Sequence, residues 1–238
     1  MSEKKWFVSA NCIELIHLAT SWGHPPSPRK LRLFACFLAR HVWHLFRDPC
    51  QHQAIRAAEL FADGEMSDRN RKCYAAAAQS YARSTRSLLQ RIPAHCATPS
   101  VDLYTITTVL GAITVTQDRW SREGWPGPFP AGLGQTVRPL SPAIMAELLR
   151  DFLRCPYPGP TRPLNPAWRT PDVLRMADAA YRHGNLDGSL DGTALAVVAD
   201  ALEEAGCNDV LLLTRLRGAG HRPRARGMWA LDLVLGKE

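Results

Sequence analysis

The residues with the clearest chemical potential are histidines and cysteines between positions 36 and 52. His41 and His44 are three residues apart, so on a helix they share one face, and Cys36 comes about one turn earlier. Cys50 and His52 follow a proline that interrupts this helix. Histidine and cysteine are zinc ligands, but this spacing matches no recognised zinc motif. We therefore expect no metal and no cofactor, and a metal-dependent hydrolase is our third hypothesis for the function.

Carboxylates form a second group that could do chemistry. Asp200 shares a helix face with both Glu203 and Glu204, and paired carboxylates can transfer protons or bind metal ions. However, no second helix supplies the histidines or the Glu-x-x-His pattern that would complete such a site. The sequence also lacks the common nucleophile, phosphate-loop and metalloprotease motifs. We expect solvated carboxylates on a scaffold helix, no catalytic residue and no enzymatic activity.

The surrounding stretch, residues 199–218, also imitates a DNA-binding helix-turn-helix. Such motifs read bases with the first residues of the second helix. Here that helix would begin with Asn208 and Asp209 and continue with four aliphatic residues, which suit an anionic groove badly. We expect Gly206 to end the first helix at positive φ and Asn208 to cap the second. The stretch would then be a helical hairpin whose two apolar faces share one core.

Arginine is the basis of the nucleic-acid hypothesis. Of the 29 basic residues 24 are arginine, and residues 1–95 contain 14 Lys and Arg against 7 Asp and Glu. A guanidinium binds phosphate through two parallel hydrogen bonds, although a GC-rich genome would also enrich arginine. The pattern of residues 69–92 predicts one helix, with Tyr74, Tyr81 and Leu88 in the core and a basic stripe opposite. The candidate nucleic-acid-binding residues are Arg69, Lys72, Arg83, Arg86, Arg40 and Arg47, with Trp43 beside the last two.

A basic loop near the C-terminus is a candidate anion site. The run GAGHRPRARG can hold a phosphate or the carboxylate of a partner, and a solvated turn is the alternative. The candidate partner- or anion-binding residues are His221, Arg222, Arg224 and Arg226.

Helix signals outnumber strand signals along the chain. Pro28, behind a serine, begins a segment that is apolar on both faces and is therefore expected at the centre of the core. Ser67 is expected to cap a later helix, as is Thr170 in front of Pro171. β-Branched residues in the segment 101–120 would also suit a strand, but its length favours a helix.

These elements predict an all-α protein, a helical bundle in two regions joined by a proline-rich extended segment. Residues 121–171 hold 11 of the 18 prolines. We expect a basic helical region over 1–120, a proline-rich connector with one short helix over 121–170, and a second helical region over 171–238.

Composition limits the class of protein. Hydrophobic residues make up 46% and charged residues 21%, which is typical of a globular chain. Seven scattered cysteines have neither disulfide-scaffold nor metal-knuckle spacing, and no apolar run is long enough to span a membrane. We expect a soluble, cytoplasmic protein that does not bind membranes.

Several segments resemble a large, paralogue-rich bacterial family of uncharacterised helical proteins. The shared features are a Lys-Leu-Arg-Leu-Phe-Ala helix near the N-terminus, a Pro-Ala-Trp-Arg-Thr hinge, and an Ala-Asp-Ala-Leu-Glu-Glu-Ala-Gly helix near the end. The last helix is similar to a module found beside repeat domains. The resemblance implies partner-specific recognition, as in immunity or defence accessories, and implies no catalytic residue.

We therefore expect a non-enzymatic protein-binding or adaptor module with a protein partner. The alternative is a nucleic-acid-binding accessory protein that uses the arginine-rich helix face.

Overall fold

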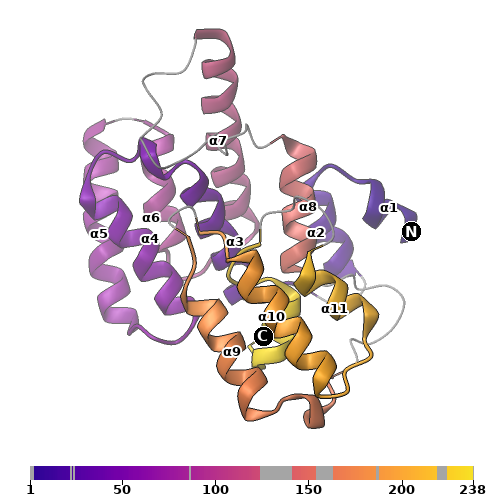
Figure 1. Cartoon of the computed structure of the whole chain (residues 1–238). Helices are drawn as coiled ribbons and strands as arrows, with labels where there is room; N and C mark the ends of the chain where they lie inside the picture. The colour runs from indigo at the N-terminus through magenta and orange to yellow at the C-terminus, as the bar shows by residue number, and fades with distance from the viewer. Residues whose placement is uncertain are drawn as a thin grey trace. The chain divides into compact units, whose positions relative to one another are not determined.

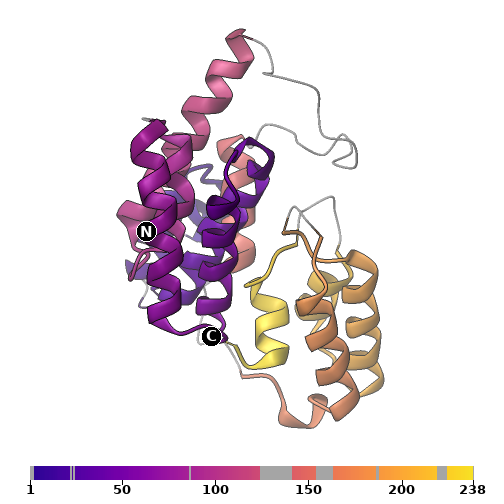
Figure 2. The same ribbon diagram turned by 90° about the vertical axis from the view of Figure 1, so that its left-hand side faces the viewer.

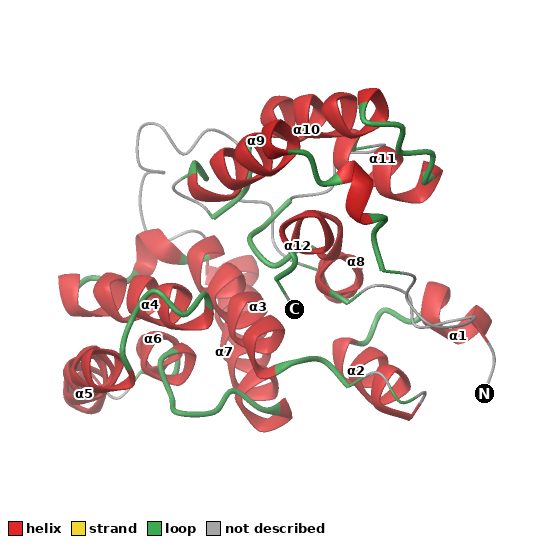
Figure 3. Cartoon of the chain, turned by 90° about the horizontal axis from the view of Figure 1, so that it is seen from below, coloured by secondary structure: helices red, strands yellow, loops and turns green. Residues whose placement is uncertain are grey.

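The computed structural model describes residues 3–21, 23, 25–85, 87–123, 141–153, 163–185, 188–218 and 224–237. Within these residues the chain forms twelve α-helices and no β-strand (Figures 1 and 3). The predicted all-α class is confirmed. The chain divides into two compact units, Met1–Ser27 with Pro142–Glu238, and Pro28–Ser141. None of the described helices is both long and apolar enough to cross a membrane.

The described residues of the unit Pro28–Ser141 form five α-helices and two short 3₁₀ helices, Trp43–Leu45 and Leu89–Arg91. The central helix is α3 (Pro28–His41), in which every residue from Leu31 to Ala39 is buried, as its two apolar faces predict. The other helices are α4 (Pro49–Ala62), α5 (Asp68–Thr85), α6 (Ile92–Cys96) and α7 (Leu103–Glu123).

Short polar side chains begin these helices. Asp48 and Gln51 form a capping box at the start of α4, where Pro49 takes the first helical position. At the start of α5 the Ser67 hydroxyl accepts a hydrogen bond from the Asn70 N–H, as predicted.

The segment 101–120 is helical, as its length predicts, and forms most of α7. Its threonine hydroxyls donate to backbone carbonyls four residues earlier, at 2.8 Å for Thr107, 2.9 Å for Thr108 and 2.6 Å for Thr116. These bonds satisfy the polar groups that β-branched threonines bring into a helix.

The predicted helix over residues 69–92 is wrong in its extent and in part of its buried face, although Ala78 and Ile92 are buried as their spacing predicts. α5 ends at Thr85, and Tyr74 and Leu88, expected in the core, are 36% and 54% exposed. The buried residues of α5 are Arg71, Ala78 and Ala82. Small alanine side chains let α5 pack closely on α4, whereas Tyr74 is exposed and Tyr81 is half-buried.

The other unit begins with α1 (Glu3–Val8) and α2 (Cys12–Ser21), which group with α8 (Pro142–Phe152). The Arg150 guanidinium on α8 donates to the carbonyls of Trp6 at 2.7 Å and Ser9 at 2.5 Å. The compact units therefore do not follow the expected ranges 1–120 and 121–170. Helical periodicity identifies an apolar face but does not identify the distant helix that covers it.

The C-terminal helices share one hydrophobic core (Figure 2). They are α9 (Pro171–Arg182), α10 (Gly192–Glu204), α11 (Val210–Arg217) and α12 (Trp229–Leu235). Thr170 caps α9 by accepting from the Val173 N–H at 3.3 Å, as predicted. The core is filled by large apolar side chains, among them Tyr181, Leu195, Leu202, Leu212, Leu216 and Leu231.

The hairpin between α10 and α11 confirms one predicted residue and corrects another. Gly206 has φ +86° and follows the C-cap of α10, as expected. Its N–H donates to the Glu203 carbonyl, and the Cys207 N–H donates to Leu202, which is a Schellman motif. The N-cap of α11 is Asp209 and not Asn208, because the Asp209 carboxylate accepts from the Leu212 N–H at 3.0 Å.

Candidate functional site

The histidine-rich segment forms a stacked cluster. The His52 ring stacks on Trp43, with 4.3 Å between ring centroids, and its Nε2 lies 3.2 Å from the Trp43 carbonyl oxygen. The guanidinium carbons of Arg40 and Arg56 lie 4.8 and 5.7 Å from the centre of the same indole. His52 is therefore held by packing and a backbone contact.

The remaining members of this cluster are buried or half-buried. Burial, together with a hydrogen bond to Cys96, raises the pKa of the Cys36 thiol well above its usual value. Burial, followed by the neighbouring His41, lowers the pKa of His44. Among the described residues no three His, Cys, Asp or Glu side chains are grouped so that they could hold a metal ion. These residues therefore provide no metal site that would support the metal-dependent hydrolase hypothesis.

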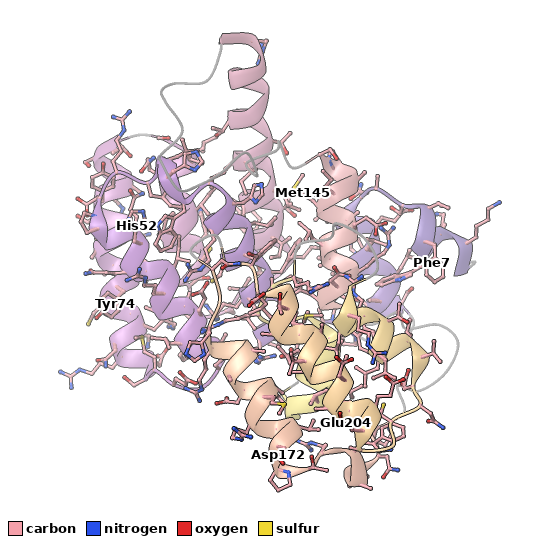
Figure 4. The ribbon with its side chains drawn as sticks, viewed as in Figure 1. Phe7, His52, Tyr74, Met145, Asp172 and Glu204 are labelled. Atoms are coloured by element: carbon pink, nitrogen blue, oxygen red, sulfur yellow. The ribbon has the colours of Figure 1, made fainter. Side chains whose placement is uncertain are left out.

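The carboxylate cluster on α10 is exposed and partly neutralised. Arg217 on α11 donates to Asp200 at 2.7 Å and also to Glu203. These hydrogen bonds, Glu203 first, raise the pKa of Arg217. Glu204 is exposed on the same helix (Figure 4). The arrangement links α10 to α11, as expected of scaffold carboxylates.

The predicted basic stripe is only partly available for binding. Arg69, Lys72 and Arg83 are exposed on α5, whereas Arg86 lies outside the described residues. The Lys72 ammonium is 2.7 Å from Asp68. Of the other two candidates, Arg47 is exposed. Arg40 instead donates hydrogen bonds of 2.5 and 2.6 Å to the two carboxylate oxygens of the buried Glu59.

Two further arginines are structural, and sequence reasoning missed them. Arg32 donates to three carbonyls in the segment 96–99, at 2.7 to 2.9 Å, and the fully buried Arg71 donates to a fourth. Both guanidinium groups lie about 5 Å from the centre of the Phe61 ring. Burial lowers the pKa of Arg32, and Arg71 lowers it further. Hydrophobic periodicity assigns every arginine to the surface. It therefore could not predict that Arg32 and Arg71 are buried.

The C-terminal basic loop uses its described arginines internally. Arg224 donates to the Arg217 carbonyl at 3.0 Å, at the end of α11. Arg226 donates to the carbonyls of Tyr181 and Arg182 at 3.0 and 3.1 Å, at the end of α9. Cations at helix C-termini satisfy unpaired carbonyls and oppose the helix dipole. His221 and Arg222 lie outside the described residues, so anion binding by this loop stays a prediction.

The outer surface of α5 carries an uncharged face that includes Tyr74 and Tyr81, the two tyrosines expected in the core. We name it the α5 face and define it as Cys73, Tyr74, Ala76, Ala77, Ser80 and Tyr81. Every residue from Cys73 to Ala82 is uncharged, yet only Ala78 and Ala82 among them are buried. Figure 4 shows Tyr74 at the outer edge of α5. Exposed arginines, Arg69 and Arg83, bound this face along the helix axis.

Net charge is concentrated in the unit that carries the α5 face. Residues 28–141 contain 15 Lys and Arg against 8 Asp and Glu, which equals the whole net charge of +7. Several acids of this unit are paired internally, since Glu59 binds Arg40, Asp63 binds Arg29 and Asp68 binds Arg71 and Lys72. Five exposed arginines make no ion pair with the described residues, namely Arg47, Arg56, Arg69, Arg83 and Arg91.

Comparisons with protein-family models, curated proteins and solved structures give no significant match. The resemblance to a paralogue-rich bacterial family therefore stays a prediction.

Proposed function

We propose that this protein is a non-enzymatic protein-binding module and that the α5 face binds an acidic partner protein. The supporting observation is that the stretch from Cys73 to Ala82 is uncharged although six of its ten residues are exposed. A helix that faces only water normally carries charged residues on its outer side. Protein interfaces are enriched in tyrosine and arginine and depleted in lysine, acids, serine and alanine, so the tyrosines and the flanking arginines carry this argument. The small residues between Tyr74 and Tyr81 would let a partner approach the helix closely.

Charge indicates the chemistry of the partner. Arg69 and Arg83 lie at the two ends of the α5 face, and the surrounding unit holds the whole net charge of +7. Complementary charge around an interface mainly accelerates association and selects the partner. An acidic protein surface with a small apolar centre would match both the uncharged α5 face and the arginines around it.

The spacing of the cations favours a protein over a nucleic acid. Arg69 and Arg83 are separated by about 21 Å along the helix axis. Duplex DNA carries one charge per about 1.7 Å of its axis, so a helix that tracks it needs closely spaced cations. The ten residues from Cys73 to Ala82 supply none, and Lys72 is paired with Asp68.

A cytoplasmic location is part of this proposal. It is supported by seven cysteines without scaffold spacing, which suit a reducing compartment.

Site-specific photo-cross-linking tests the proposal. A photo-reactive amino acid replaces Ala77 in the full chain, and a matched variant carries it at Ala179, an exposed alanine on α9. In cells, we expect position 77 to cross-link one main protein whose contacted peptide lies on an acidic surface. The purified partner should associate several-fold more slowly with Arg69→Gln/Arg83→Gln, and the difference should shrink at high salt.

Two outcomes would contradict this function. One is cross-linking at position 77 that is no more selective than cross-linking at position 179. The other is nanomolar affinity for DNA or RNA that is lost when Lys72, Arg83 and Arg86 are all changed to Gln, because that result would make nucleic acid the ligand.

A further inference from the structure

The other unit exposes a second apolar surface, at the start of α11. Val210 and Leu211 are 75% and 60% exposed, although the next two residues, Leu212 and Leu213, are buried. Beside them is the turn at Gly206, where a Cβ would have no atom within 4 Å. We name this surface the hairpin tip and define it as Gly206, Asn208, Val210 and Leu211. All four of these residues are exposed, so none of them belongs to the core.

The charge near the hairpin tip is negative. Residues 196–214 contain four carboxylates and neither lysine nor arginine. Asp200 and Glu203 share Arg217, which leaves one negative charge on that group. Asp209 caps α11 by accepting from the Leu212 N–H, and Glu204 is exposed without an ion pair among the described residues. The exposed aliphatic pair therefore lies in a segment, residues 196–214, that carries four acidic residues and no basic one.

We propose that the hairpin tip is a docking site for a basic, apolar segment of a partner protein. Val210 and Leu211 supply the apolar contact, and the open space at Gly206 lets the partner backbone approach. The carboxylates attract the cations of that segment and fix its orientation. The α5 face is surrounded by cations and the hairpin tip by anions, so the two surfaces require segments of opposite charge. The chain is thereby suited to join two different partners.

Peptide binding to the full chain tests this site. The probes are three fluorescent 16-residue peptides with the same leucine and alanine positions, whose polar positions are all Lys, all Glu or all Gln. We expect the Lys peptide to bind most tightly. Because two exposed aliphatic contacts are lost, Val210→Ser/Leu211→Ser should weaken its binding roughly tenfold or more.

Matched controls separate this site from others. Val197→Ser removes a different exposed aliphatic residue of α10, and Ala77→Arg alters the α5 face. Both should leave the affinity of the Lys peptide unchanged. Glu204→Gln should slow association without changing the thermal melt. The double serine variant should also fold, since both of its side chains are exposed.

Three results would overturn the proposal. The Lys peptide could bind the double variant as tightly as the wild type, or the Glu peptide could bind as tightly as the Lys peptide and lose that binding in the double variant. A cross-linker at Leu211 could instead react with residues 28–141 of the same chain, which would mean that the chain covers its own hairpin tip.

Discussion

Replacing Gly206 by alanine tests the hairpin between α10 and α11 quantitatively. Gly206 has φ +86°, and no atom lies within 4 Å of the position that a Cβ would take. The cost of Gly206→Ala therefore comes from backbone strain alone, and we expect about 1 to 2 kcal/mol.

Gly218 offers a matched comparison at the other end of α11. Its φ is +72°, but a Cβ there would overlap the Arg224 guanidinium, which donates to the Arg217 carbonyl. Gly218→Ala should cost the same strain plus the lost hydrogen bond, about 0.5–1.5 kcal/mol more. Glu203→Gln/Glu204→Gln should cost little, because both side chains are exposed.

Urea unfolding followed by circular dichroism measures these differences. In a thermal melt each kcal/mol corresponds to about 2–4 °C for a protein of this size. The reasoning would be refuted if Gly206→Ala were as stable as the wild type, or less stable than Gly218→Ala.

Three further predictions concern the unit Pro28–Ser141. Arg71→Ala should destabilise the chain by about 2–3 kcal/mol in urea unfolding, since it leaves a cavity and removes the donor of a buried carbonyl; a cost below 0.5 kcal/mol would contradict a structural role. In the native protein at pH 8, thiol labelling read by mass spectrometry should modify the exposed Cys73 first and spare Cys36, whose pKa burial raises; equal rates would be inconsistent with this burial. Hydrogen bonds from the Thr105 N–H and hydroxyl lower the pKa of Asp102 in the folded protein. The ionised Asp102 therefore contributes its full stabilisation of the folded state above about pH 4, and this contribution is lost as the pH falls through the lowered pKa. Asp102→Ala should therefore reduce the acid sensitivity of the urea midpoint between pH 6 and pH 3, and an unchanged pH profile would argue against this cap.

Local features of the fold could be predicted from the sequence because their causes are local. The cap at Thr170 depends on residues within one turn, as does the positive φ at Gly206. Asp209 replaced Asn208 as the N-cap because both residues can accept the hydrogen bond, and the turn length decides which one does. The all-α class follows from many such signals together.

Tertiary packing could not be predicted, and the candidate site depends on it. The helical spacing of residues 69–92 placed Tyr74 and Tyr81 in the core, but the buried residues of α5 are Arg71, Ala78 and Ala82. The same reversal exposes the α5 face. The buried Arg71 donates to the Ala97 carbonyl after α6 and to the Asp68 carboxylate, and no spacing in the sequence indicates the contact with Ala97.

The most direct test of the central claim uses the partner protein that cross-links to position 77. Its affinity is measured for the wild-type chain and for the variant Ala77→Arg. A new guanidinium in the middle of the α5 face would be buried against a partner that packs there, at a cost well above that of a solvated charge. We predict that isothermal titration calorimetry will show at least about a hundredfold weaker binding for Ala77→Arg, while Ala179→Arg binds like the wild type. Equal affinities for the wild type, Ala77→Arg and Ala179→Arg would contradict the claim that the α5 face is the binding surface.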